Sequence, residues 1–204
     1  AIGERLRPIT SIGIRDIIMD TETGYRLPKR VRLTIGCVYF STYFKHDDRG
    51  VVAKARDVLD AHNIELDVFP NYGMKTPHNT IQTDFEPADT EADYRRVYQM
   101  AKEKLKQMGC TFVIPLPIVF AKYKYSGYGI APKVPGQLTR LVMIYPEGNS
   151  DKMDLVHEIG HAAGLEHDTR SDAQPRNFMH VASPRSVLYK YQVEALGKAP
   201  FSVG

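Results

Sequence analysis

One short stretch in the last quarter of the chain constrains the local fold more strongly than any other: His157-Glu158-Ile159-Gly160-His161-Ala162-Ala163-Gly164-Leu165-Glu166-His167-Asp168. Two histidines four residues apart share one face of an α-helix, with their Cβ atoms about 5–6 Å apart. Gly164 follows them, and glycine adopts the left-handed conformation that ends a helix without a steric penalty. The spacing therefore predicts a helix through His157 and His161, then a sharp turn that returns His167 to the same side.

Three imidazoles on one side of a helix and its turn form a ligand set for a divalent metal ion. Zinc binds imidazole nitrogen at about 2.0–2.1 Å, and three protein ligands leave its fourth position open to water, as at catalytic sites. We therefore expect one Zn²⁺ bound by His157, His161 and His167, with Glu158 as the general base that acts on the zinc-activated water. A structural zinc without catalysis is the alternative, but the motif holds no fourth Cys or His ligand for it.

The stretch resembles the zinc motif of the metzincin metallopeptidases. The resemblance implies that the three histidines bind zinc, that Glu158 is the catalytic base and that Gly164 makes the turn. It also implies that Met179 lies in a tight turn beneath the metal, although an ordinary core methionine is the other interpretation. Asp168 follows the third histidine directly, where it either anchors the turn or orients a ligand as an outer partner.

The resemblance is clear over residues 120–196 and weaker over 31–119. In that family an edge strand above the cleft binds the substrate backbone, and another strand then leads to the zinc helix. The residues implied for substrate binding are consecutive: Gly127, Tyr128, Gly129, Ile130 and Ala131. Glycines there allow a peptide backbone to approach closely and to pair as an added strand. A Gly-rich sheet edge that binds no substrate is the alternative.

One feature of the family is missing from this chain. Some members place a tyrosine just after the methionine turn, as a further ligand and donor, whereas Val181 stands here. His180, Tyr189 and Tyr191 are candidates for a replacement donor, but packing or surface positions are the simpler interpretation of each.

Hydrophobic periodicity predicts strands and helices in alternation, and hence an α/β or α+β fold. Strands are expected at 31–40, 64–69, 110–120, 128–131 and 138–145, and helices at 47–62, 91–108, about 151–163 and 184–196. Pro115 and Pro117 predict that their strand is an edge or bends, and Ser150 or Asp151 is expected to cap the third helix. The resemblance implies a metzincin-like form: a twisted mixed sheet with its edge strand over the active-site cleft, a zinc-binding helix, and a small C-terminal lobe ending in a helix.

The length of 204 residues suits one domain, or one domain divided by a cleft. We expect residues 1–30 to be an N-terminal extension or linker and 31–204 to be the catalytic domain, with an upper lobe at about 31–164 and a lower lobe at about 165–204. The first residue is Ala1 rather than Met, and the first thirty residues are rich in turns. This indicates a monomeric catalytic module attached to further N-terminal domains of a larger secreted, exported or effector protein.

Composition excludes several other classes. Hydrophobic residues make up 43% and charged residues 25%, which is ordinary for a globular domain, and the net charge of +3 is too small to indicate nucleic-acid binding. No apolar run approaches the roughly 18–20 residues of a membrane span. Two cysteines exclude a disulfide-rich scaffold; Cys37 and Cys110 form either one bridge or two free thiols, and their apolar surroundings favour free thiols.

A cluster of basic and aromatic residues follows residue 121: Lys122, Tyr123, Lys124, Tyr125 and Tyr128. It would suit an acidic or polymeric substrate, but side chains snorkelling over the surface explain it more simply.

The function predicted from these observations is that of a zinc-dependent endopeptidase acting on a protein or peptide substrate. Two alternatives remain at this point. One is a zinc-binding interaction or toxin module without proteolysis, and the other is an amidase acting on cell-wall peptides.

Overall fold

Among the described residues, seven strands form the central sheet, in the order β2-β1-β4-β6-β5, with β3 and β9 also paired to β1. Their bounds are β1 Val31–Phe40, β2 Ile64–Phe69, β3 Thr80–Ile81, β4 Leu116–Phe120, β5 Gly127–Ile130, β6 Leu141–Ile144 and β9 Ser202–Val203. A second sheet has two short strands, β7 Arg176–Asn177 and β8 Arg185–Val187. The computed structural model describes residues 22–45, 47–71, 73–111, 114–124, 127–130, 140–169 and 175–203.

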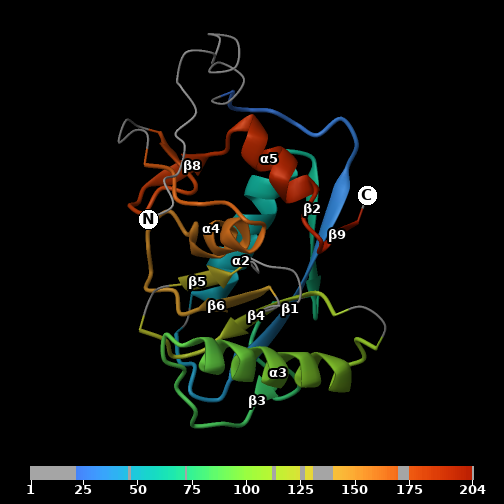
Figure 1. Ribbon diagram of the computed structural model, residues 1–204, viewed down its shortest axis with the longest axis vertical. Coiled ribbons are helices and arrows are strands. Elements are labelled where there is room, and N and C mark those ends of the chain that lie inside the picture. Colours follow the sequence, from blue (N-terminus) through green and yellow to red (C-terminus); the bar gives the residue numbers. More distant parts are fainter. Residues whose placement is uncertain are drawn as a thin grey trace, which may run out of the picture.

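Four helices are present in the described residues: α2 Asp48–Asp60, α3 Glu91–Gln107, α4 Asp154–Ala162 and α5 Lys190–Gly197. Helix α3 lies on one side of the sheet, and α4, α2 and α5 lie on the other (Figure 1). The chain therefore has a mixed α/β fold with helices on both faces of its main sheet.

The alternation of side chains along β1 explains how both faces are covered. Leu33, Ile35 and Cys37 belong to a large core shared with α2, α4 and α5, whereas Val38 and Phe40 belong to a second core under α3. Successive side chains of a strand point to opposite faces, and a strand buried on both faces has few polar positions. The strand predicted from alternating apolar residues is thus present, and from Ile35 onward it is buried on both faces.

In the part of the chain that the structure describes, β5 is the last strand on one side of the main sheet. β1 pairs in parallel with β2 and β4, and β4 pairs in parallel with β6, whereas β5 runs antiparallel to β6 and ends the sheet. Pro115 and Pro117 predicted an edge strand or a bend, and the first of these is wrong, because β4 lies between β1 and β6. Pro117 lies opposite Gly36 of β1, and the pairing of β4 with β6 begins only at Ile118.

Several predicted boundaries are confirmed, and two local predictions need correction. The strands at 31–40 and 64–69 have the expected bounds, and the first three helices differ from the predicted ranges by only a few residues. The last helix does not begin at Pro184, because residues 185–187 form β8 and α5 begins at Lys190. The residue before α4 is Met153, so neither Ser150 nor Asp151 caps it; the Asp151 carboxylate instead accepts a hydrogen bond from the Met153 amide at 3.1 Å. Residues 71–88, which lie between the elements expected from the sequence, contain the short strand β3.

Both cysteines are free thiols: Cys37 is buried in β1 and Cys110 is half-buried. Burial raises the pKa of Cys37 to about 12, so this thiol stays protonated and packs as a small apolar group. Among the described residues, no helix is long and apolar enough to cross a membrane.

Candidate metal centre

Helix α4 is almost completely buried, because its apolar side chains pack into the large core on several sides. Leu155, Val156, Ile159 and Ala162 are all fully buried. His157 and Glu158 lie on the same helix with only 5% and 8% exposure. Their polar groups must therefore find partners inside the protein, and these partners determine the geometry of the site.

The turn after α4 has the form that the glycine predicted. Gly164 has φ +92°, its amide donates to the His161 carbonyl at 2.9 Å, and the Leu165 amide donates to the Gly160 carbonyl at 3.0 Å. These two bonds form a Schellman motif, in which a left-handed residue satisfies the last carbonyls of a helix. The chain consequently reverses and returns along the helix.

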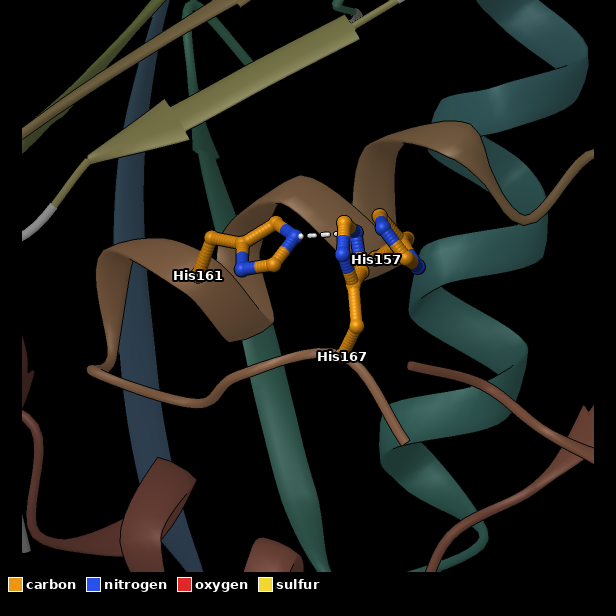
Figure 2. Close-up of side chains that lie close together, drawn as sticks. All are labelled: His157, His161 and His167. Atoms are coloured by element: carbon orange, nitrogen blue, oxygen red, sulfur yellow. Dashed lines mark hydrogen bonds between the residues drawn. The ribbon is translucent and has the colours of Figure 1, made fainter. Parts of the chain in front are cut away.

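This reversal brings the three histidines together. One possible ligand atom from each of His157, His161 and His167 lies within 4.8 Å of the other two, and the Nε2 atoms of His161 and His167 are 3.0 Å apart. Figure 2 shows His157 and His161 on the helix and His167 on the loop that follows it. The group is open to solvent on one side, because His167 is exposed and His161 is half-buried.

Two of the rings are oriented by backbone carbonyls. The Nδ1 atom of His157 lies 2.7 Å from the Phe178 oxygen, and the Nδ1 atom of His161 lies 2.8 Å from the Leu165 oxygen. A carbonyl only accepts hydrogen bonds, so each Nδ1 carries the proton and each Nε2 presents a lone pair. Metal-binding histidines are commonly held in this way.

Burial keeps these rings neutral. It lowers the pKa of His157 to about 3 and also lowers the pKa values of His161 and His167. Neutral imidazole is the form that binds a metal. The donor set, its tautomers and its spacing therefore fit one divalent ion, and zinc is the ion that three imidazoles with an open fourth position suit best.

Glu158 lies beneath the edge strand β5. Burial, and after it the nearby Asp154 carboxylate, raise the pKa of Glu158 to about 8, while a hydrogen bond from the Gly129 amide acts in the opposite direction. A cation held by the histidines would also favour the charged carboxylate, because opposite charge stabilises it. The side chain is thus a buried acid–base group next to a candidate metal site.

The glycines of β5 let this strand lie directly on α4. A Cβ atom at Gly129 would be 2.1 Å from the Glu158 carbonyl oxygen, and one at Gly127 would be 2.7 Å from Glu158 Cγ. The close approach expected at these glycines therefore includes the protein's own helix. Ile130 is half-buried against the second core. The structure describes only the backbone of Tyr128, and Ala131 lies outside the described residues.

We expect Gly129→Ala to destabilise the fold by about 1–3 kcal/mol, the usual cost of overpacking. The added methyl group would push β5 away from the backbone of α4, because the clashing atom belongs to the main chain. Urea denaturation of the variant and the wild type measures the difference. An unchanged midpoint would show that the strand and helix are not in the contact described.

Met179 lies beneath the helix that carries the histidines. It is fully buried, and a Cβ atom at Gly160 would be 2.4 Å from its sulfur. The His180 amide donates to the Asn177 carbonyl at 3.0 Å, so Met179 occupies a tight turn. Asp168 is buried, and its amide donates to the Met179 carbonyl at 3.0 Å. The backbone at Asp168 thereby links the loop of His167 to this turn.

The other candidate donors have different surroundings. Val181, whose side chain has no donor group, is 64% exposed. Tyr191 is also at the surface, where its hydroxyl accepts a hydrogen bond from the Gln192 amide at 3.3 Å, and Tyr189 directly precedes α5. His180 is buried, and after burial the electrostatic effect of His180 is the second cause of the lowered pKa of His167. The electrostatic effect of His180 thus reaches the histidine group.

The basic and aromatic cluster divides into surface and core. Lys122 pairs with Glu86 at 2.7 Å and Lys124 with Asp89 at 3.6 Å, all at exposed positions. Tyr123 is only 4% exposed and belongs to the core under α3. Tyr125 lies outside the described residues, as does the side chain of Tyr128. The two lysines are thus engaged with acidic partners, which supports the surface interpretation for them.

Sequence reasoning missed a group of buried polar residues next to the site: Asp151, Asp154, Asn177, Arg185 and Gln192. Arg185 pairs with both aspartates, and the side-chain amides of Asn177 and Gln192 bond to each other at 2.7 and 2.9 Å. These residues are separated along the chain and form no recognisable motif. Only the fold brings them together.

Comparison with known proteins does not identify a family. No family model matches the chain, and no curated protein matches it. A solved structure described as "Mirolysin in complex with compound 9" matches with a TM-score of 0.49 and 14% identity, over 83% of this chain and 91% of that chain. A similarity at this level does not indicate an activity.

Proposed function

We propose that this chain is a zinc-dependent endopeptidase. The observation that carries the proposal is the convergence of three neutral histidines on one point, with the buried carboxylate of Glu158 beside the first of them. His157, His161 and His167 would hold the ion through their Nε2 atoms. Their Nδ1 atoms are unavailable at two of the three rings, because backbone carbonyls occupy them.

The chemistry divides between the ion and the chain. When bound, zinc would act as a Lewis acid that activates water and polarises the scissile carbonyl. Glu158 would accept a proton from the attacking water and pass it to the leaving amine. Its burial suits this shuttle, because a raised pKa brings a carboxyl group close to the working pH.

The substrate would bind as an extended peptide along β5. Among the residues that the structure describes, this strand ends the sheet and pairs with β6, and no described strand lies along its other edge. An added strand makes main-chain hydrogen bonds that do not depend on sequence. We infer that Gly127, Tyr128, Gly129, Ile130 and Ala131 form this binding edge, with Gly164, Asp168 and Met179 as structural support of the metal site.

We further propose that residues 31–204 are the catalytic domain. The division between its lobes would fall after α4, at about residue 164. The lower lobe, 165–204, would then supply the third histidine, the Met179 turn and the final helix.

The test is cleavage of a peptide library and of denatured casein by the purified chain. We expect cleavage that stops with a strong zinc chelator and returns when zinc is added in slight excess. A metal analysis of the same sample should give one zinc per chain. A zinc-loaded, folded protein that leaves all these amide substrates intact would contradict the peptidase, and a chain that binds no zinc would contradict the site.

A further inference from the structure

A buried arginine joins the strand β8 to the beginning of the metal-site helix. Arg185 Nε lies 2.9 Å from Asp151 Oδ2, and its Nη2 lies 3.2 Å from Asp151 Oδ1 and 3.1 Å from Asp154 Oδ1. The backbone amide of Arg185 also donates to Asp151 Oδ2 at 2.9 Å. All three side chains are 5% exposed. The guanidinium thus links β8 to the residues at the start of α4.

Strand β8 in turn holds the turn that contains Met179. Val187, at the end of β8, accepts a hydrogen bond from the Phe178 amide at 2.8 Å and one from the Asn177 side chain at 3.1 Å. β7 and β8 pair in parallel, with Arg176 opposite Arg185. A shift of β8 would therefore also move the backbone of Phe178, which is hydrogen-bonded to it.

Phe178 then orients the first histidine. Its carbonyl is the group that lies 2.7 Å from His157 Nδ1. The next carbonyl, that of Met179, accepts the amide of Asp168 beside His167. The same short turn consequently contacts the ring of one metal-site histidine and the backbone next to another.

The contacts therefore run from the start of α4 through Arg185, β8 and Phe178 back to His157 on the same helix. We propose that Arg185 is a positioning residue for the metal centre: it ties the turn at Phe178 to the start of α4, and so holds the His157 ring in the orientation that binds the ion. The inference rests on one part of the proposed function, namely that the three histidines bind zinc. It does not depend on peptide cleavage.

Loss of Arg185 should therefore lower the affinity of the site for zinc. The carboxylates of Asp151 and Asp154 would stay buried without their cation, and Asp154 Oδ2 already has no hydrogen-bond partner among the described residues. β8 would shift to relieve this, and the Phe178 carbonyl would shift with it. Removing an outer partner of a metal ligand usually weakens binding by about 10–100-fold.

The experiment compares Arg185→Met with a variant that destabilises the fold elsewhere. Leu105→Ala removes a fully buried side chain from α3, in the core on the opposite face of the sheet. Zinc dissociation constants are measured by competition with a chromophoric chelator, at a temperature where circular dichroism shows every variant folded. We expect an increase of about 10–100-fold for Arg185→Met and less than about twofold for Leu105→Ala.

Arg185→Lys keeps the charge but not the forked geometry of the guanidinium, so it should also weaken binding and should alter the absorption bands of the Co²⁺-loaded protein. If Arg185→Met does not fold, Arg185→Lys takes its place in the comparison of zinc affinities with Leu105→Ala. Equal zinc affinity in the wild type and in the folded Arg185 variants would overturn the inference. So would equal losses in these variants and Leu105→Ala, since instability alone would then explain the effect. A wild type without zinc binding would instead overturn the proposed function itself.

Discussion

Replacing Glu158 by glutamine is expected to lower kcat/KM for peptide cleavage by about 10²–10⁴-fold, the usual contribution of a positioned acid–base group. Glutamine keeps the size of the side chain and its place beneath β5, but it cannot accept a proton at neutral pH. Because Glu158 is not one of the proposed ligands, zinc affinity should change by less than about tenfold. Steady-state kinetics and chelator competition on the same preparation measure both quantities.

Glu166→Gln is the matched control, because Glu166 lies in the same segment and is exposed. It should retain the activity of the wild type. If Glu158→Gln cleaves peptide as fast as Glu166→Gln does, Glu158 is not the base. If zinc binding is lost together with activity, Glu158 is needed to hold the metal ion, and the proposal that it serves only as the base is wrong.

Replacing His167 by alanine should abolish tight zinc binding and, with it, peptide cleavage. A ligand in contact with the ion contributes more than an outer partner, so the loss should exceed the roughly 10–100-fold that an outer partner costs. His167 is exposed and lies on a loop, and therefore its removal should barely change the stability of the metal-free protein. Isothermal titration with zinc and thermal unfolding with and without zinc measure the two effects.

In thermal unfolding, the quantity to compare is the stabilisation that zinc gives to each variant. Zinc at 100 times its dissociation constant should stabilise the wild type by about 2.7 kcal/mol, and this gain should disappear in His167→Ala. His78→Ala is the control, since His78 is exposed and lies outside the histidine group. Zinc stabilisation of His167→Ala equal to that of His78→Ala would show that His167 is not a ligand.

Local sequence patterns predicted much of the fold. The alternating run at 31–40 and the helical periodicities at 47–62 and 91–108 identify elements whose bounds differ little from those observed. These patterns succeed because period-2 and period-3.6 burial depend on neighbours along the chain. Prediction failed after Pro184, where a proline that suits the start of a helix instead precedes a strand.

That failure has a tertiary cause. Residues 185–187 pair with β7, and Arg185 is bound by carboxylates more than thirty positions earlier in the chain. Helix propensity is a weak preference, and a buried ion pair with strand pairing outweighs it. The same cause accounts for the central position of β4, since a strand's neighbours in the sheet depend on the whole topology.

What the sequence alone determined is the identity of the candidate ligands and base, because the helix spacing of His157 and His161 and the left-handed turn at Gly164 are local properties of the backbone. What only the tertiary structure decided is the orientation and protonation of those groups. The carbonyl of Phe178 faces His157, and β5 covers Glu158, because segments far apart in the chain pack together. Burial, which sets the pKa values of the site, is produced by that packing and so cannot be read from the motif.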